Sequence, residues 1–306
     1  MKKLITICLV AAMLAASTMP TTARGDIYVV NYNNGTIGKY TNSGATVNAS
    51  LVSGLDYPTG IAVSGSNLFV TNYNNGTIGE YTTSGTTVNA SLVSGLTAPT
   101  GIAVSGSNLF VSDITGTISE YTTSGATVNA PLVSGLRSPY CIAVSGSNLF
   151  VANMNQGLTA NGMIGKYTTL GATVNAYLIP GLDNPSGIAV SGSDLFVTSG
   201  NIIGEYTTSG ATVNASLVSG LDGPYGIAVS GSNLFVANMN NGMIGEYTTS
   251  GATVNASLVS GLSGPTGIAV TADVPEPATI CLLGIGALSL IRRKKSEFFV
   301  RKGKRE

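Results

Sequence analysis

Short apolar stretches alternate with small polar turns along most of this chain. Between positions 58 and 99, apolar and β-branched side chains gather at residues 60–64, 68–73, 77–82 and 88–93. Each stretch ends at a turn rich in Gly, Asn or Ser, and none has the i, i+3, i+4 spacing of an amphipathic helix. The pattern predicts four consecutive short strands that form a meandering antiparallel sheet.

The same pattern recurs about every 41 residues. The phrase Pro-x-Gly-Ile-Ala-Val, changed in a single copy, begins at positions 58, 99, 139, 185, 224 and 265. A tyrosine of the expected third strand recurs in step with it, at positions 40, 81, 121, 167, 206 and 247. A unit of about 40 residues with four strands is the size of one β-propeller blade.

The two ends of the repeated region predict how the ring closes. The last unit stops after a first strand at residues 267–270, whereas the region begins with a second and a third strand at residues 26–40. Together they complete a sixth blade, in which the N- and C-terminal strands pair and leave no exposed edge. We therefore predict an all-β fold over residues 24–273, a six-bladed β-propeller of four-stranded antiparallel blades.

This unit resembles the NHL repeat, in which Pro-x-Gly-Ile-Ala-Val is followed by a glycine turn and Leu-x-Val-x-Asp. The similarity covers about 250 of the 306 residues and implies a propeller. NHL repeats often have an acidic residue after the second strand, and here only Asp113 keeps it. The other copies have Asn31, Asn72, Asn153, Ser199 and Asn238 at this position.

Charge is scarce and unevenly distributed. Charged residues make up 9% of the chain, and there is neither His nor Trp. Residues 24–273 contain four basic and eleven acidic side chains, which gives a formal net charge of −7. Such an acidic body argues against nucleic acid as a partner, because phosphates require a basic face.

The N-terminal segment has the features of an export signal. Lys2 and Lys3 precede an apolar run at residues 4–16, and small residues follow up to Ala23. This order predicts a secretory signal peptide over residues 1–23, with cleavage after Ala16 or Ser17 as the alternative. A retained N-terminal anchor is a second interpretation, although the apolar run is short for a membrane span.

The C-terminal segment, residues 274–295, combines a Pro-Glu-Pro motif, an apolar stretch and a basic cluster. The stretch at residues 278–291 would cover about 21 Å as a helix, a short transmembrane segment. The positive-inside rule places the basic cluster and the tail at residues 296–306 in the cytoplasm, with the body outside. An ordinary single-span anchor is one interpretation of this arrangement.

The same segment resembles the PEP-CTERM sorting signal of exported bacterial proteins. The resemblance implies an exosortase-type processing enzyme as partner, transient anchoring in the inner membrane, and transfer to the cell surface or extracellular matrix. The residues that carry it are Pro275, Glu276, Pro277, Arg292 and Arg293.

The repeated body offers little catalytic chemistry. Without His it lacks the usual general base and the commonest metal ligand, so we predict no cofactor, no metal and no enzymatic activity. Cys141 is the one cysteine of the body and replaces a repeated Gly. We interpret it as sequence drift and not as a reactive thiol, which would need a basic neighbour.

Two sets of carboxylates recur at equivalent positions. The first set shares a third-strand position that Lys occupies in two copies, and we interpret this position as solvated. The second set, Asp56, Asp183 and Asp222, stands in the turn before the next blade, where Asp favours turns; a weak Ca²⁺ site is the alternative. The third-strand position is filled by Lys39, Glu80, Glu120, Lys166, Glu205 and Glu246.

The copies differ mainly in two connections, which a blade of alternating strands places on one face. One joins the second and third strands and varies in length; the other, such as Asp56-Tyr57, leads to the next blade. Variable loops on a rigid scaffold are the usual place of binding. The predicted ligand-binding residues on this face are Tyr32, Tyr73, Asp113, Arg137, Met154 and Met239.

These observations predict an exported surface or matrix protein that binds protein or polysaccharide without catalysis. Two alternatives stay open. One is a propeller enzyme of the lactonase or lyase kind, and the other is a purely structural surface protein, which nearly identical repeats would suit.

Overall fold

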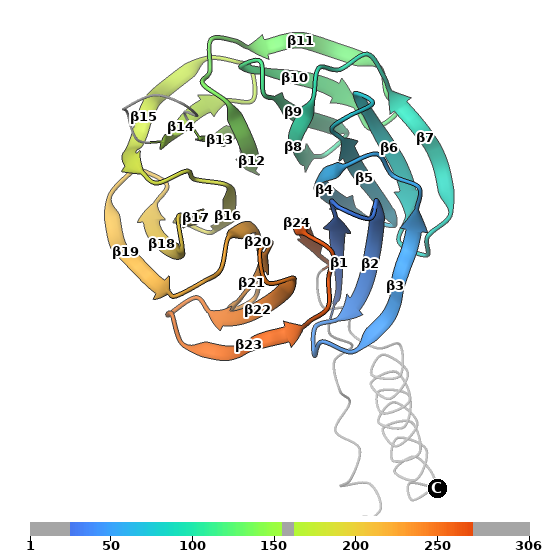
Figure 1. Cartoon of the computed structure of the whole chain (residues 1–306). Helices are drawn as coiled ribbons and strands as arrows, with labels where there is room; N and C mark the ends of the chain where they lie inside the picture. Colours follow the sequence, from blue (N-terminus) through green and yellow to red (C-terminus); the bar gives the residue numbers. More distant parts are fainter. Residues whose placement is uncertain (1–24, 155–161, 272–306) are drawn as a thin grey trace, which may run out of the picture. The chain divides into compact units, whose positions relative to one another are not determined.

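The computed structural model describes residues 25–154 and 162–271, which form a ring of six four-stranded antiparallel sheets (Figure 1). The fold class predicted from the repeat is therefore confirmed. The predicted signal peptide, sorting signal and basic tail lie outside the described residues. Within the part of the chain that the structure describes, no helix is long and apolar enough to cross a membrane.

Each sheet is one blade, and blades 1 to 6 are numbered here in chain order. Blade 1 consists of β24 (Pro265–Val270), β1 (Asp26–Asn31), β2 (Thr36–Thr41) and β3 (Thr46–Ser53). Blade 2 consists of β4 (Pro58–Ser64), β5 (Asn67–Asn72), β6 (Thr77–Thr82) and β7 (Thr87–Val93). Blade 3 consists of β8 (Pro99–Ser105), β9 (Asn108–Asp113), β10 (Thr117–Thr122) and β11 (Thr127–Val133). Blade 4 consists of β12 (Pro139–Ser145), β13 (Asn148–Asn153), β14 (Gly162–Thr168) and β15 (Thr173–Leu182). Blade 5 consists of β16 (Gly187–Ser191), β17 (Asp194–Ser199), β18 (Ile202–Thr207) and β19 (Thr212–Ser219). Blade 6 consists of β20 (Pro224–Ser230), β21 (Asn233–Asn238), β22 (Met243–Thr248) and β23 (Thr253–Val259).

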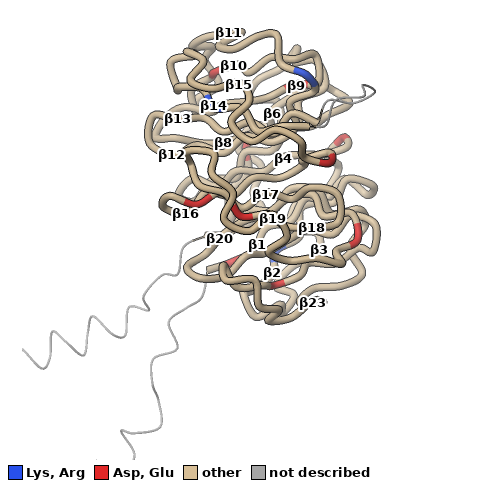
Figure 2. The backbone as a smooth tube through the Cα atoms, turned by 90° about the vertical axis from the view of Figure 1, so that its left-hand side faces the viewer, with Lys and Arg blue, Asp and Glu red and all other residues tan. Residues whose placement is uncertain are grey.

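In every blade the strands follow one another from the centre of the ring to its rim. The first strands, such as β4 and β12, surround the centre, and the fourth strands, such as β7 and β15, form the circumference (Figure 1). A side view shows charged residues scattered thinly over the ring (Figure 2). The ring therefore exposes the ends of its strands on two faces, which carry different loops.

Blade 1 closes the ring as predicted. β24 pairs antiparallel with β1, and Tyr28 lies opposite Ala269 while Val29 lies opposite Ile268. Ile268 packs in a buried cluster with Ile27 of β1 and Phe235 of the neighbouring blade. Residues from the two ends of the ring thus share one sheet and one core, which removes both free edges.

The hydrophobic core lies between neighbouring blades. Phe69 and Ile78 of blade 2, for example, form one buried cluster with Leu109 and Tyr121 of blade 3. Second and third strands are covered by the adjacent blades on both sides, so Phe69, Leu109 and Ile78 are at most 1% exposed. Burial of such a side chain contributes about 1.5–3 kcal/mol to stability, and the equivalent side chains of the other blades contribute in the same way.

One glycine of the repeat is required by a close approach of two chain segments. Gly76 has a φ of 64°, and a Cβ atom there would lie 2.1 Å from the carbonyl oxygen of Leu96. The Leu96 amide in turn donates to the Gly76 carbonyl at 3.0 Å. This contact links the turn after β5 to the segment that leaves β7, and it explains why glycine recurs at this position in most copies.

The outer strands protect their own edges. In β7, Asn89 accepts a hydrogen bond from the backbone amide of Ser91 at 3.1 Å, and Asn214 does the same for Ser216 in β19. An amide that is already bonded cannot pair with the edge strand of another molecule. The repeated Asn-Ala-Ser phrase therefore has a structural role at the rim.

The third-strand position interpreted as solvated is in fact buried in three copies, and that interpretation was wrong. Glu80, Glu120 and Glu246 are 8%, 8% and 4% exposed. The adjacent blade covers the strand, so each carboxylate needs a partner. An asparagine of the neighbouring strand supplies it: Asn67, Asn108 and Asn233 donate to these glutamates at 2.8, 2.8 and 2.7 Å. In blade 1 the position holds Lys39, which forms an ion pair with Asp26 at 2.8 Å.

Blade 5 breaks this pairing and yields a prediction. Asp194 replaces the donor asparagine, and the pKa of Glu205 is raised by burial and by the charge of Asp194. A raised pKa means that the folded state holds the proton more tightly, so stability falls as pH rises from the usual Glu value through the raised one. We expect Asp194→Asn to increase stability at neutral pH by about 1 kcal/mol and to flatten this pH dependence.

The measurement is urea unfolding at pH 4 to 8. Asn233→Asp is the reciprocal variant, because it gives blade 6 the carboxylate pair of blade 5, and it should destabilise the ring. Equal stability of the parent chain and Asp194→Asn across this range would contradict the prediction.

Candidate functional site

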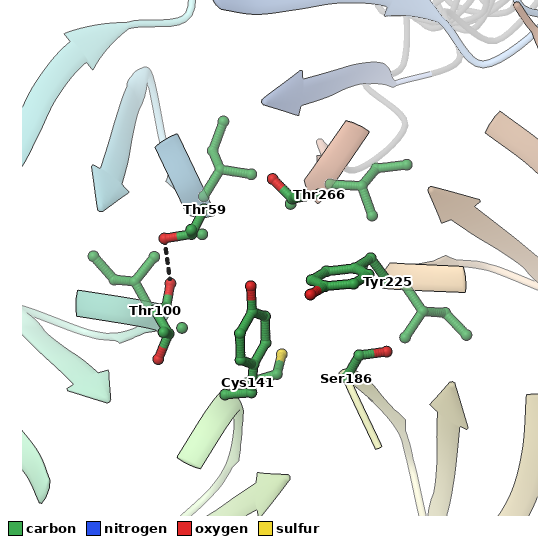
Figure 3. A pocket seen from close by; sticks show the side chains of 15 residues that line it. Thr59, Thr100, Cys141, Ser186, Tyr225 and Thr266 are labelled. Carbon is green, nitrogen blue, oxygen red and sulfur yellow. Dashed lines mark hydrogen bonds between the residues drawn. The ribbon is translucent and has the colours of Figure 1, made fainter. Parts of the chain in front are cut away.

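The centre of the ring is lined by the residue that follows the proline of each repeat. In all six copies this residue carries a hydroxyl group. Together with adjacent Gly and Ile residues, these side chains surround a central hollow of about 60 Å³ (Figure 3). The six residues are Thr59, Thr100, Tyr140, Ser186, Tyr225 and Thr266.

The four small hydroxyls of this set join neighbouring blades. Thr59 Oγ1 donates to the carbonyl oxygen of Pro99 in the next blade at 3.0 Å. Thr100 Oγ1, Ser186 Oγ and Thr266 Oγ1 donate to the equivalent prolines, Pro139, Pro224 and Pro58, at 3.0, 2.9 and 3.3 Å. These buried hydrogen bonds hold the inner strands together, so the small hydroxyls have a structural role.

The two tyrosines depart from this scheme together with their neighbours. Thr59 lies 3.0 Å from the hydroxyl of Thr71 on the second strand, an arrangement that blades 3 and 5 repeat with Thr or Ser. In blades 4 and 6 the second-strand residue is Ala152 or Ala237, which are fully buried. Alanine has a methyl group in place of the hydroxyl and therefore needs no hydrogen bond from the neighbouring tyrosine. Each blade that has tyrosine at this first-strand position therefore also has alanine at the neighbouring second-strand position.

Tyr140 and Tyr225 meet across the central hollow. Their ring centroids are 5.2 Å apart with an interplanar angle of 83°, an edge-to-face contact. Burial raises the pKa of Tyr140 well above its usual range, and the Tyr225 phenol raises it further. The Tyr140 phenol therefore stays protonated at neutral pH, which suits a hydrogen-bond donor and not a general base.

Three further tyrosines come from the variable connections. Tyr32 follows β1, Tyr57 precedes β4, and Tyr73 follows β5. The rings of Tyr32 and Tyr57 are 4.9 Å apart, and the backbone amide of Tyr73 donates to the Tyr57 carbonyl at 3.1 Å. The two predicted variable connections thus lie side by side.

These tyrosines are also close to the pair in the hollow. The pKa of Tyr32 is raised by burial and by the phenols of Tyr73, Tyr57 and Tyr225. The phenols of Tyr32 and Tyr73 also contribute to the raised pKa of Tyr140. We call Tyr32, Tyr57, Tyr73, Tyr140 and Tyr225 the tyrosine cluster.

Of the residues predicted for this face, Tyr32 and Tyr73 belong to the cluster and the others do not join it. The Asp113 carboxylate accepts hydrogen bonds from its own loop, including the Thr115 amide at 2.9 Å and the Thr117 hydroxyl. Arg137 is exposed and Met239 is half-buried. Met154 is only 9% exposed. Its side chain is therefore buried, whereas the sequence pattern predicted it on the binding face.

Tyr140 and Tyr225 were not among the predicted site residues, although the sequence holds a signal for them. Both stand at the variable position of Pro-x-Gly, where the other copies have Thr or Ser. A large ring at a position that is otherwise small marks a departure from the repeat. What the pattern does not reveal is that this position faces the centre of the ring.

The remaining candidates for chemistry are engaged locally. Asp56 accepts hydrogen bonds from Asn74 at 3.0 and 3.1 Å, and Asp222 accepts one from Asn240 at 3.2 Å. Within the described ranges no three acidic, Cys or His side chains come together as a metal site. Burial raises the pKa of the Cys141 thiol at the wall of the hollow, which disfavours the reactive thiolate.

Comparisons with known proteins gave matches for the C-terminal segment and for the propeller. Residues 273–295 match the PEP-CTERM protein-sorting motif. The motif implies that the protein is exported and recognised by an exosortase, a membrane-associated processing enzyme. No curated protein sequence matches the chain.

Solved structures share the propeller fold at low sequence identity. The crystal structure of a nidogen/laminin complex contains a chain with a TM-score of 0.69 and 16% identity, and the match covers 82% of this chain and 99% of that one. A gluconolactonase from Xanthomonas campestris has a TM-score of 0.61 at 16% identity and coverages of 78% and 89%. Virginiamycin B lyase from Staphylococcus aureus has a TM-score of 0.58 at 19% identity and coverages of 84% and 91%. These similarities support the propeller fold and leave activity undetermined.

Proposed function

We propose that this chain is a non-enzymatic binding module of the cell surface or extracellular matrix, which holds a protein or polysaccharide ligand at the tyrosine cluster. One observation carries the proposal. Six tyrosines of the repeat are buried in the core, whereas Tyr140 and Tyr225 line the central hollow, and three tyrosines of the variable connections contact one another and interact electrostatically with that pair. Side chains that depart from a repeat and still come together supply a regular scaffold with a specific site.

The exposed ring of Tyr57 supports a role in binding. Its φ of 51° is left-handed, and this conformation costs a residue with a Cβ about 1–2 kcal/mol. The equivalent position is glycine in blades 1 and 6, at Gly264 and Gly223. Tyr57 is nonetheless 46% exposed, so burial does not compensate for the strain. Ala98, Ser138 and Asn184 adopt the same left-handed conformation in blades 3, 4 and 5, so the strain belongs to this turn of the repeat, and the exposed ring is what distinguishes Tyr57.

The chemistry of the hollow favours binding over catalysis. The lyase neighbour is described as catalytically inactive when one histidine is replaced by alanine, and this chain contains no histidine. The small hydroxyls are bonded to backbone carbonyls, and the raised pKa values of Tyr140 and Cys141 keep both groups protonated. None of these groups is prepared to act as a base or nucleophile.

The sorting motif supports the proposed location. After export, a membrane segment at residues 278–291 would hold the chain transiently in the inner membrane, and exosortase processing near Pro275 to Pro277 would release the propeller to the surface or matrix.

The test is retention of the purified full chain on envelope and matrix material from cells that export it. We expect Tyr32→Ala combined with Tyr73→Ala to reduce retention by about tenfold or more, because clustered aromatic anchors dominate binding. Tyr177→Ser is the matched control: Tyr177 is 64% exposed on β15, where four other copies have Ser. Retention that survives the double substitution would favour a purely structural protein, and turnover of lactones by the chain would favour an enzyme.

A further inference from the structure

The central hollow has a chemistry that selects one kind of chemical group. Resting on the proposed function, we propose that the part of the ligand that enters it is a compact organic cation of the quaternary ammonium type. Size, hydrogen bonding, ring geometry and charge each support this assignment.

The hollow is small. Its volume of about 60 Å³ is far below the roughly 300–1,000 Å³ of pockets that enclose whole drug-sized ligands. Only a head group of a few heavy atoms enters, and the remainder of the ligand lies outside, over Tyr32, Tyr57 and Tyr73. A trimethylammonium group is compact enough, whereas an entire sugar ring with its hydroxyls is not.

The walls offer few free hydrogen bonds. Thr59, Thr100 and Ser186 have already donated their protons to backbone carbonyls of the next blades. Between them the walls consist of glycines and of isoleucines such as Ile61 and Ile102. Apart from the phenols of Tyr140 and Tyr225, a sugar or a primary amine would find few partners for its polar groups there, and unpaired polar groups are costly. A quaternary ammonium group has no N–H donor and therefore needs no hydrogen-bond acceptor from the walls.

The two rings in the hollow attract positive charge. The face of an uncharged phenol is negative, so a cation within about 6 Å of its centroid is stabilised, most strongly where water is excluded. In an edge-to-face pair the partner covers only one ring face, so Tyr140 and Tyr225 retain faces for a ligand. The same fold already places cations over rings elsewhere, with Lys39 over Tyr28 at 5.5 Å and Lys166 over Phe150 at 5.4 Å.

The charge of the ring is complementary to such a ligand. The described residues include three basic and ten acidic side chains, a formal net charge of −7. Lys39 is paired with Asp26, and Lys166 donates to the Thr208 carbonyl. Arg137 is the basic residue on the face of the cluster, where Asp56 and Asp222 occupy the equivalent position of other blades. The field therefore favours cations overall.

The test compares choline with its neutral isostere, 3,3-dimethyl-1-butanol, on the full chain. The chain has 13 tyrosines and no tryptophan, so tyrosine fluorescence reports directly on the rings. We expect choline to bind saturably and the isostere to bind at least about tenfold more weakly, because the two differ in charge and hardly in shape. Equal binding of the two compounds, or no saturable change with choline, would overturn the proposal.

A swap within the repeat provides the sharpest variant. Tyr225→Thr with Ala237→Thr gives blade 6 the Thr59–Thr71 arrangement of blade 2, so the fold has a precedent within the same chain. We expect it to weaken choline binding about tenfold or more, while Tyr177→Ser leaves binding unchanged. Tyr225→Phe keeps the ring and should retain choline binding within about threefold; its loss would mean that the hydroxyl and not the ring face holds the ligand, which would contradict the proposal.

Competition identifies where the cation comes from. If choline releases the chain from envelope material, the cation belongs to a polymer or protein of the envelope; if choline binds without releasing it, the cation is a free small molecule. Should choline fail to bind while Tyr32→Ala with Tyr73→Ala still abolishes retention, the cation proposal fails and the proposed binding function stands. Loss of neither property in any cluster variant would refute both.

Discussion

Deletion of residues 265–271, which removes β24, is expected to abolish cooperative folding of the propeller. β24 pairs with β1, and its Ile268 packs with Ile27 and Phe235, so two neighbouring blades lose core contacts. Thr266 also bonds the carbonyl of Pro58 in blade 2. The loss of ladder hydrogen bonds and of a buried isoleucine removes several kcal/mol, comparable to the roughly 5–15 kcal/mol that stabilise a whole protein.

Thermal unfolding followed by circular dichroism, together with size-exclusion chromatography, measures this effect. The uncovered edge of β1 should also make the shortened chain associate. Deletion of residues 272–306 is the control and should leave the unfolding transition unchanged. A synthetic peptide with the β24 sequence should restore folding by strand addition, and the same peptide with Ile268→Asp should not. A cooperative transition at the parent temperature without β24 would show that the closing strand is dispensable.

Replacement of Tyr57 is expected to separate binding from stability. Tyr57→Gly and Tyr57→Ala both remove the ring that contacts Tyr32, so both should lose ligand retention by about tenfold or more. The glycine variant should be more stable than the alanine variant by about 1 kcal/mol, the reverse of the usual order for these two residues. The reason is the left-handed φ of 51°, which alanine tolerates poorly and glycine adopts freely.

Urea unfolding of the two variants measures the difference, and the retention assay measures binding. Thr59, which lies two residues away in the inner strand, gives a contrasting control. There the backbone is extended and the hydroxyl bonds Pro99, so Thr59→Gly should be less stable than Thr59→Ala. If alanine were the more stable replacement at position 57, the backbone strain expected from the left-handed φ would be absent.

Local patterns anticipated most of the fold. The phrase that begins at Pro58 and the turn at Gly76 delimit the strands closely, because short-range turn chemistry and β-propensity set their ends. The divided unit at residues 26–40 and 267–270 predicted the pairing of β1 with β24, since a strand left without a partner must find one. The variable connections were also placed correctly on one face.

The errors arose where burial depends on the neighbouring blade. Glu80 looks like a solvated strand residue because nothing in its own blade encloses it, yet blade packing buries it beside Asn67. Met154 lies in a variable connection but is buried as well. Side-chain alternation along a strand indicates which face a residue takes, and it does not tell what covers that face.

The sequence was therefore sufficient for blade number, strand order, ring closure and the sorting motif, because each depends on residues close together or on a repeat count. The tyrosine cluster is different. Tyr32 and Tyr225 are far apart in the chain and stand at different positions of the repeat. They approach one another only because the closed ring brings inner strands and loops of different blades to one central opening. Curvature of the packed blades sets those distances, and no local pattern records it.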